Sequence, residues 1–375
     1  MKGIGGVGRV ERLVGVDLLR ALAIVQVVAV HINNIYIPAP QGLPALIAKP
    51  HWADGVTLFF VVSGFLITRA IMLRERDLYR LSLRGFYIRR IARIQPLLLA
   101  SIAFGAAMLA LGFTAEPFMN QPHGRFDAAF WLSLVTFSFN WLRVAAAQNC
   151  MLNEWGMHWD VMWSLAIEEQ FYLVLPIALW LAGQRNRFLL LLLAAIAVCA
   201  GQRLSAPDFS SFTGYDALGV GVLASILAPL FPARLAIAAM PLGAIILGLG
   251  VVAPELAGLR PFLVIGGAAI FILGDQAKDD VFKGVVLGPL FRIVARIGEL
   301  SYELYLLHPL VLVLVAPTFF VWRLNYGMAV IYAVAIAAVF AHLVETYFTR
   351  PMNTLLRRSL LPSAALPMAA HEVRV

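Results

Sequence analysis

Long apolar runs, each close to 20 residues, alternate with short polar connections along most of the chain. At about 1.5 Å per residue, a helical run of this length crosses the ~30 Å hydrocarbon core of a bilayer. The pattern predicts an all-α, polytopic membrane bundle of about ten transmembrane helices. These helices are expected at residues 18–37, 55–73, 94–112, 163–182, 187–204, 212–230, 235–253, 257–273, 299–320 and 328–348.

The stretch 126–142 fits this pattern less well, because it is short, rich in aromatic residues and bracketed by Arg125 and Arg143. Basic residues gather at the cytoplasmic ends of membrane helices. With ten spans and a cytoplasmic N-terminus, most Lys and Arg residues fall on the inner side. An eleventh crossing at 126–142 would place most of the later ones outside. We therefore interpret 126–142 as a re-entrant or interfacial segment and place both termini in the cytoplasm.

Composition excludes several classes of protein. Hydrophobic residues make up 61% of the chain and charged residues 13%, against ~25% charged residues in a soluble domain. A soluble protein of 375 residues would lack enough polar side chains to cover its surface. An ordinary soluble enzyme, a disordered chain and a fibrous repeat are thus excluded. The net charge of +8 does not indicate a nucleic-acid partner, because topology accounts for the basic residues.

The sequence indicates one membrane domain at residues 1–350, followed by a cytoplasmic tail at 351–375. The first apolar run is too long for a typical signal peptide and ends in polar residues, so we expect a retained helix. Gly3–Gly8 matches the dinucleotide pattern GxGxxG, but no strand precedes it. Cys150 and Cys199 are placed in a loop and a span, which argues against a disulfide framework. No Cys/His cluster has the spacing of a metal site.

Ionisable residues inside predicted spans are the strongest indication of function, because such groups face the bundle interior, a partner or a water-filled path. Arg20 and His31 are eleven residues apart on the first helix. Three helical turns return them to within ~20° of the same face, about 16 Å apart along the axis. Asp17 precedes Arg20 by one turn and can pair with it. A snorkelling arginine and a packing histidine are the structural alternative.

Other polar residues in the spans have structural alternatives of the same kind. Glu168 and Glu169 begin the helix at 163–182, where they could simply cap its N-terminus. His308 lies deep in the helix at 299–320 and needs a partner. His342 and Glu345 are one turn apart, so Glu345 could neutralise a cytoplasmic arginine.

Taken together, these segments resemble the acyltransferase 3 family of integral membrane acyltransferases, whose members acylate carbohydrates and other acceptors at the bacterial envelope. The matching strings occur in family order and cover nearly the whole chain. They are Gly15–Ile24 running to His31, Gly55–Thr68, Arg89–Pro96, Trp163–Tyr172, Ser301–Pro309, and Glu345 with Arg350–Pro351.

The resemblance implies roles for particular residues. The family's Arg-x10-His signature falls on Arg20 and His31, which it implies are catalytic. Its Arg-x-x-Arg motif falls on Arg90 and Arg93, which it links to acyl-CoA. One departure is Gly214, where members often have arginine after the preceding threonine, although the nearby Asp216 fits. Supporting roles are expected for Asp17, Glu168, Glu169, Tyr302, His308 and Glu345.

The expected function is transfer of an acyl group to a hydroxyl of an envelope carbohydrate or glycolipid. The resemblance implies that the transferred group is acetyl. Cytoplasmic acyl-CoA is the expected co-substrate, docking its phosphates on Arg90 and Arg93 and passing its pantetheine arm by Arg20. His31 would deprotonate the acceptor or form an acyl-imidazole. No permanently bound cofactor, metal or nucleic acid is expected.

Two other functions are compatible with buried ionisable residues. A proton-coupled secondary transporter uses them as well, although such carriers often contain an internal repeat, which we do not detect. A lipid- or partner-binding scaffold would tolerate substitution of His31. We expect the chain in the inner membrane of a bacterium, with acyl-CoA, the acceptor and the lipid bilayer as its partners.

Overall fold

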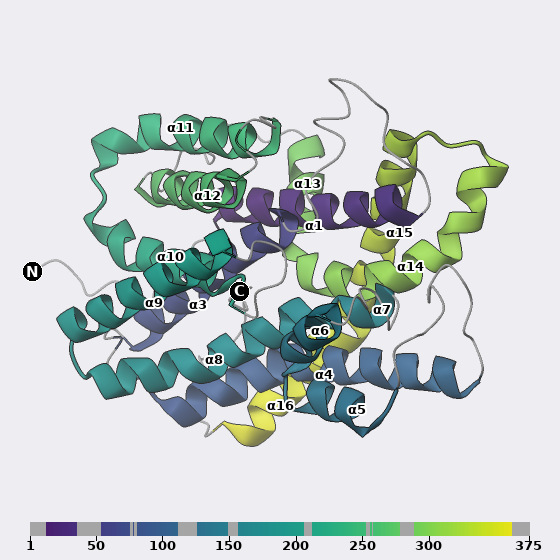
Figure 1. The fold of residues 1–375 in the computed structure, drawn as a ribbon, viewed down its shortest axis with the longest axis horizontal. Coiled ribbons are helices and arrows are strands. Elements are labelled where there is room, and N and C mark those ends of the chain that lie inside the picture. The colour runs from purple at the N-terminus through teal and green to yellow at the C-terminus, as the bar shows by residue number, and fades with distance from the viewer. Residues whose placement is uncertain are drawn as a thin grey trace, which may run out of the picture.

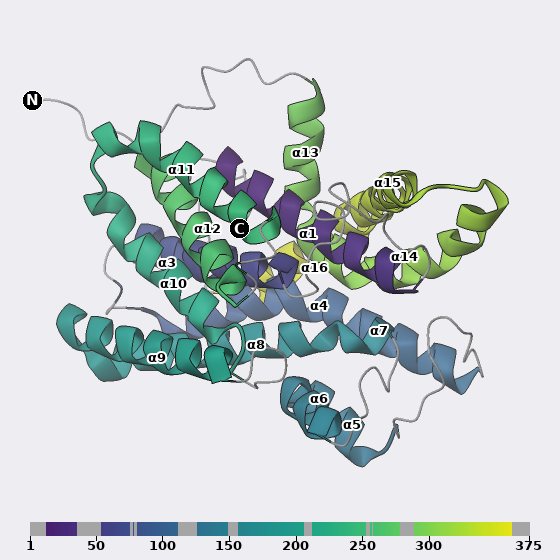
Figure 2. The same ribbon diagram turned by 45° about the horizontal axis from the view of Figure 1, so that its top comes forward.

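A computed structural model gives the arrangement of the helices (Figures 1 and 2). It describes residues 13–35, 54–75, 81–111, 126–148, 157–205, 212–252, 258–277 and 289–361, together with residues 78 and 256. Within these ranges the regular structure is helical and contains no strand. The Gly3–Gly8 motif, Cys150 and residues 362–375 of the predicted tail lie outside the described residues.

Each of the ten predicted stretches lies on a helix. These helices are α1 (Val14–Ile35), α3 (Asp54–Glu75), α4 (Leu83–Ala110), α8 (Met162–Ala182), α9 (Arg185–Ser205), α10 (Tyr215–Leu227), α11 (Ala233–Val252), α12 (Arg260–Ala277), α14 (Ser301–Val321) and α15 (Tyr326–Val344). Five further helices are α5 (Ala128–Val135), α6 (Phe139–Gln148), α7 (Met157–Asp160), α13 (Pro289–Glu299) and α16 (Arg350–Leu360). A 3₁₀ turn (Ala228–Leu230) follows α10, and a π-helical turn (Glu345–Thr349) joins α15 to α16.

Eight helices in the described ranges are long and apolar enough to cross a membrane. They include α1, α3, α4, α8, α9, α11, α14 and the continuous α15–α16 segment. The other two predicted spans form the shorter helices α10 and α12. The prediction of an all-α, multi-pass membrane protein is therefore confirmed, while the cytoplasmic location of the termini stays a prediction.

Residues 126–142 do not form a single membrane-spanning helix. They begin with α5, of eight residues, and continue into α6, of ten. At 1.5 Å per residue each is far too short to cross 30 Å of hydrocarbon. The chain turns between them at Phe137, which has a positive φ of 55°. The pair lies at one edge of the bundle beside α8 (Figure 2), in agreement with a re-entrant or interfacial segment.

Helix α1 is the central element of the bundle. It packs against α3, α12, α13, α14 and α15, and Figure 1 shows it crossing between the α11–α12 pair and the α14–α15 pair. Its side chains Ile24 and Ile32 are fully buried. Polar groups on α1 are therefore held by neighbours on several sides.

Two helices approach each other closely near Ser63 and Gly64. Helix α3 packs tightly on α10, and a Cβ atom at Gly64 would overlap the carbonyl group of Leu218. Gly221 on α10 lies equally close to the backbone of Val61. Small residues that let two backbones meet are typical of helix contacts in membranes, where burial of apolar surface gives little drive for association.

Arg203, at the end of the predicted span 187–204, is buried inside the bundle. It lies in α9 and is only 2% exposed, and its guanidinium donates two hydrogen bonds to Asp216 of α10, Nε to Oδ2 at 2.6 Å and Nη2 to Oδ1 at 2.7 Å. This bidentate pair neutralises both charges inside the bundle. A side chain at Gly214 would collide with the ring of Phe60, so an arginine could not occupy that position without rearrangement.

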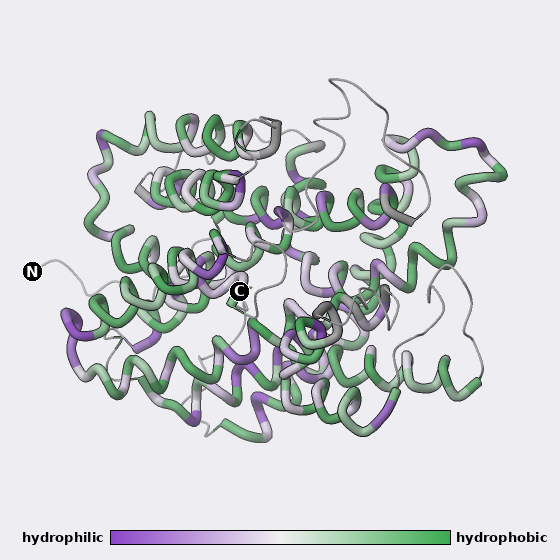
Figure 3. Tube along the Cα trace, viewed as in Figure 1, coloured by the Kyte–Doolittle hydropathy of each residue, from purple (hydrophilic) through white to green (hydrophobic). Residues whose placement is uncertain are grey.

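Hydrophobic residues dominate the helices along most of their length, and hydrophilic residues gather near the connections and in the middle of the bundle, around α4 and α8 (Figure 3). A hydrophilic interior is costly in a membrane bundle unless it binds something or forms internal pairs. This region contains the candidate site.

Candidate active site

The N-terminus of α1 is fixed by a carboxylate from another helix. Asp275 of α12 accepts hydrogen bonds from the backbone N–H groups of Gly15 and Val16. These donors have no partner within the helix, and a carboxylate at this end also complements the helix dipole. Gly15 is required at this position, because a Cβ atom there would lie 2.6 Å from the Asp275 carboxylate. The cap fixes the position of α1 relative to α12.

Arg20 is held one turn further along α1. Its Nη1 lies 3.6 Å from Oδ1 of Asp17, and its Nε donates a hydrogen bond of 3.0 Å to the hydroxyl of Ser301 on α14. The side chains of Arg20 and Asp17 are 11% and 10% exposed. Arg20 is therefore directed into the bundle, as the expected Asp17–Arg20 pairing requires, and does not snorkel to the surface.

His31 also faces α14. Its ring centroid lies 5.0 Å from that of His308, at an interplanar angle of 58°. Its Nδ1 lies 2.8 Å from the carbonyl oxygen of Val27. Arg20 and His31 thus meet the same neighbouring helix, the first at Ser301 and the second at His308, as their eleven-residue spacing predicts.

A cavity extends from Arg20 along α3, α4, α8 and α14. Its volume is about 100 Å³, enough for roughly seven to ten water-sized groups at 10–15 Å³ each. The cationic residues in its lining are Arg20, Arg90 and Arg93, and Glu168 is the acidic one. Its other residues are Val56, Phe59, Phe60, Val62, Ser63, Leu66, Ile67, Ile94, Ser164, Leu165, Tyr172, Ser301, Tyr302 and Tyr305.

Aromatic rings and hydroxyls position the charged groups of this cavity. The guanidinium of Arg90 lies 5.3 Å from the ring centroid of Tyr172, within cation–π range. The carboxylate of Glu168 accepts a hydrogen bond from Ser63. Tyr302 donates from its hydroxyl to the carbonyl oxygen of Ile94 on α4, at 2.6 Å. Three cations and one carboxylate give the cavity an excess of positive charge, which suits an anionic ligand.

His31 does not line this cavity, although the expected path of the pantetheine arm leads past Arg20 to the site of transfer. The cavity reaches Tyr305, whose hydroxyl is hydrogen-bonded to Ser164 at 2.6 Å. The ring of Tyr305 lies 5.7 Å from that of His308 on the far side. Tyr305 therefore stands between the cationic cavity and the His31–His308 pair.

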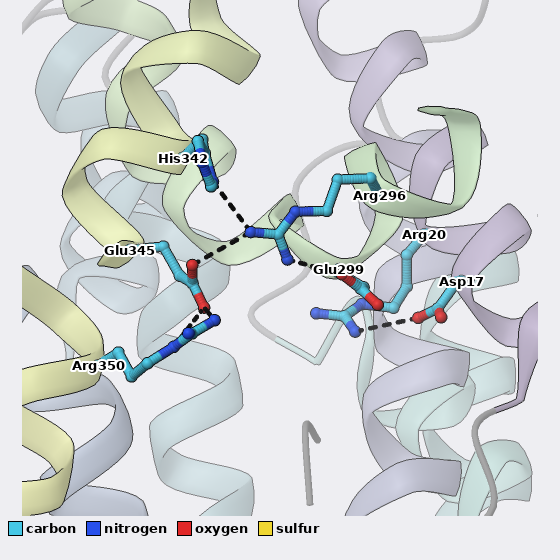
Figure 4. A network of polar contacts seen from close by, with 7 residues as sticks. All are labelled: Asp17, Arg20, Arg296, Glu299, His342, Glu345 and Arg350. Carbon is cyan, nitrogen blue, oxygen red and sulfur yellow. Dashed lines mark hydrogen bonds and ion pairs between the residues drawn. The ribbon is translucent and has the colours of Figure 1, made fainter. Parts of the chain in front are cut away.

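Glu345 lies outside the cavity, in a network of ion pairs (Figure 4). Its carboxylate contacts Arg350 at 2.7 Å and Arg296 at 3.1 Å, and Arg296 also contacts Glu299 at 2.6 Å and Nδ1 of His342 at 3.0 Å. Burial lowers the pKa of Arg296, but hydrogen bonds and charge from Glu299 and Glu345 outweigh it and raise the pKa above its usual value. The predicted neutralisation of an arginine by Glu345 is confirmed.

Two buried polar residues of this region, Glu303 and His158, were not singled out from the sequence. Glu303 is fully buried on α14, and neither of its carboxylate oxygens has a hydrogen-bond partner among the described residues. Its charge inside a predicted span could have indicated it. Glu169, for which a supporting role was expected, is half-buried and does not line the cavity. His158, on α7, is buried against α4, and burial lowers its pKa to about 4.

The α5–α6 pair is attached to the bundle through Gln170 of α8, which follows Ala166 by one helical turn. Gln170 donates to the carbonyl oxygen of Phe137 and, at 2.8 Å, to Oδ1 of Asn140, and it accepts a hydrogen bond from Tyr215. These contacts fix the turn between α5 and α6 against the helix that carries Glu168. No pattern in the sequence links these four residues.

In the part of the chain that the structure describes, no group of three or more His, Cys, Asp or Glu side chains could hold a metal ion. The described site presents guanidinium, carboxylate, hydroxyl and imidazole groups. Such a set can bind an anion and can exchange a proton with a hydroxyl.

Comparison with known families gives one extensive match. Residues 13–343 match a family model, acyltransferase 3, which is described as an acyltransferase domain. The match includes the cavity residues and both histidines of the pair. No solved structure matches the chain.

Several named proteins are similar to the chain. The peptidoglycan O-acetyltransferase OatA of Listeria monocytogenes is 26% identical over 366 residues, which covers 90% of this chain and 55% of that protein. A Staphylococcus aureus (strain COL) protein that carries an O-acetyltransferase name is 30% identical over 179 residues, or 48% of this chain and 26% of that protein. The chain thus spans about half or less of the length of these relatives.

Proposed function

The chain belongs to the acyltransferase 3 family, and from that premise we propose that it is a membrane O-acetyltransferase. The proposed donor is cytoplasmic acetyl-CoA, and the proposed acceptor is a hydroxyl of an envelope carbohydrate. The observation that carries the proposal is the arrangement along α1, which presents Arg20 to a cationic cavity and His31 to a second histidine.

The cavity supplies the donor site of the proposal. Arg90 and Arg93 bind the phosphates of acetyl-CoA, because guanidinium groups match phosphate oxygens in shape and keep their charge. Arg20, about 16 Å from His31 along the helix, binds the pantetheine arm. The arm reaches His31 by displacing the ring of Tyr305.

The reaction proceeds at His31. Its Nε2 takes the proton of the acceptor hydroxyl, and the oxygen forms a bond to the carbonyl carbon of the thioester. The C–S bond then breaks, its electron pair stays on the sulfur of CoA, and that sulfur takes the proton from His31. An acetyl ester and free CoA thiol result. In the alternative route, Nε2 attacks the thioester itself, and the acetyl group passes from the imidazole to the acceptor.

The relatives support a sugar as the acceptor. OatA is named as a peptidoglycan O-acetyltransferase, and so is a Bacillus subtilis relative, YrhL, that is 27% identical over 201 residues, 51% of this chain and 28% of that protein. Peptidoglycan is a polymer of N-acetylated amino sugars with free hydroxyls. We assign the same acceptor class to this chain.

The purified chain in lipid nanodiscs tests the proposal. Radiolabelled acetyl-CoA and chitotetraose, an N-acetylated amino-sugar oligomer, are supplied, and labelled ester is measured. The wild type should form acetyl-chitotetraose. His31→Ala and Arg20→Ala should each lower the transfer rate at least 100-fold, in keeping with the ~10²–10⁴-fold contribution of general-base catalysis.

A matched control is His342→Ala, which removes an exposed histidine from the network around Glu345. This variant should keep its transfer rate to within threefold. Wild-type rates in the folded His31→Ala protein would contradict the assignment of His31. Absence of transfer to any carbohydrate by the wild type would contradict the proposed function.

A further inference from the structure

In both histidines of the pair, Nε2 is the ring nitrogen that can accept a proton. Nδ1 of His31 lies 2.8 Å from the carbonyl oxygen of Val27, and Nδ1 of His308 lies 2.7 Å from that of Tyr305. A carbonyl oxygen can only accept, so each Nδ1 carries the hydrogen and donates it. In a neutral imidazole, the lone pair then resides on Nε2.

The second nitrogen of His308 has no partner among the residues that the structure describes. His308 is 1% exposed, and its Nε2 makes no hydrogen bond within these residues. A buried acceptor without a donor is unfavourable inside an apolar bundle. Its neighbour His31 is half-buried, so a molecule can reach the pair from the His31 side. A ligand that brings a hydroxyl donor would satisfy Nε2.

His158, on a neighbouring helix, also has one ring nitrogen that is left as an acceptor, although it is the opposite one. Its Nε2 donates to the carbonyl oxygen of Ser101 at 3.2 Å, and its buried Nδ1 has no partner within the described ranges. Helix α7, which carries it, packs against α14. The region beyond Tyr305 is thus rich in hydrogen-bond acceptors, while the cavity on the other side holds three arginine donors. Phosphates match the arginines, and hydroxyl groups match the imidazoles.

We propose that Nε2 of His308 is an acceptor-binding subsite that takes a second hydroxyl of the substrate, next to the hydroxyl that His31 activates. The ring centroids are only 5.0 Å apart, so one small ligand can contact both imidazoles. The substrate class is therefore a diol or polyol whose two hydroxyls lie close together in space, as in a sugar, and a lone alcohol is a poor acceptor. This inference rests on the proposed acetyl transfer.

Two minimal acceptors that differ by one hydroxyl test the subsite. The chain in nanodiscs receives acetyl-CoA and either 1,2-propanediol or 1-propanol, and kcat/KM is measured for each. The wild type should prefer the diol by tenfold or more. His308→Leu, which has no lone pair, should lose at least tenfold on the diol and less than threefold on 1-propanol. His308→Gln, which keeps an acceptor oxygen, should recover part of the diol preference.

Each other outcome decides against the subsite or against the function. An equal loss on both alcohols in the His308 variants would assign His308 a packing or proton-relay role and overturn the inference. A bound water that satisfies Nε2 would leave the wild type with no diol preference, which also overturns it. If the wild type acetylates chitotetraose but neither small alcohol, the function stands and the subsite falls. If it acetylates none of the three, the proposed function itself fails.

A measurement on the wild type alone covers the case in which His308→Leu does not fold. Nitrogen-15 NMR of histidine-labelled protein reports which ring nitrogen carries hydrogen. Both His31 and His308 should show hydrogen on Nδ1, and 1,2-propanediol should shift the Nε2 resonance of His308. Hydrogen on Nε2 of His308 in the free protein would refute the proposal.

Discussion

Removal of the two cavity arginines of α4 should weaken donor binding without disabling the chemistry. Arg90 and Arg93 line the cavity together with Arg20, whereas His31 and His308 do not line it. The perturbation is Arg90→Gln, Arg93→Gln and the double variant. Glutamine keeps a similar length and some polarity but removes the charge that would meet a phosphate.

The magnitude follows from the exposure of these side chains. A hydrogen bond to a charged group contributes about 1.5–3 kcal/mol, and both arginines are half-buried, so the lower end applies. About 1.4 kcal/mol is tenfold in affinity. Each single variant should raise the KM for acetyl-CoA about tenfold and the double variant about 100-fold, while kcat changes less than threefold.

A donor that lacks the nucleotide separates this effect from general damage. Acetyl-pantetheine carries the thioester and the arm without the phosphates, so wild type and variants should use it with the same KM. Arg89→Gln is the matched control, because Arg89 pairs with Glu75 at 3.4 Å and does not line the cavity. It should leave both donors unaffected.

Two results would refute this reasoning. An unchanged KM for acetyl-CoA in the double variant would remove the phosphate role of both arginines. An equal rise in KM for acetyl-CoA and acetyl-pantetheine would show that the substitutions distort the cavity and do not remove a phosphate contact.

Three further predictions concern stability, measured by thermal unfolding in detergent. Asp216→Asn should lower the free energy of unfolding by about 3–5 kcal/mol, because it leaves Arg203 buried without its counter-charge. The double change to Arg203→Met and Asp216→Leu should restore most of this stability. Additive losses in the double variant would contradict the prediction. Because burial holds the pKa of His158 near 4, below its ordinary 6.5, the unfolded chain binds a proton that the folded chain excludes, so stability should fall by up to roughly 3 kcal/mol from pH 6.5 to pH 4. A His158→Phe variant should lack that component, and an unchanged pH slope would disprove it. Gly64→Ala should destabilise the protein by about 1–3 kcal/mol, because the added methyl group overlaps α10. Gly248→Ala is the control, since the space around Gly248 is open. Equal effects of the two substitutions would contradict the close packing at Gly64.

Helical periodicity explains which parts of the site could be predicted from the sequence. The spacing of Arg20 and His31 depends only on local helix geometry, so their shared face could be predicted before the neighbour was known. The identity of that neighbour could not. It is α14, about 280 positions later in the chain, where Ser301 and His308 meet them.

Long-range pairing accounts for what the sequence did not reveal. Arg203 and Asp216 are close in sequence, but their pairing depends on how α9 and α10 pack. The position of Tyr305 between the cavity and His31 depends on three helices at once. Length alone correctly indicated that 126–142 is not an ordinary span, but not its turn at Phe137.

In the proposed mechanism, donor and acceptor meet on α1 from opposite sides of the membrane. Proteoliposomes with the chain in one orientation test it directly, with acetyl-CoA outside, on the side of Arg90, and chitotetraose sealed inside. Acetyl-chitotetraose should form in the lumen at a rate that His31→Ala abolishes. Acetylation only of chitotetraose added on the same side as acetyl-CoA, or lumenal product that persists in His31→Ala, would contradict the account.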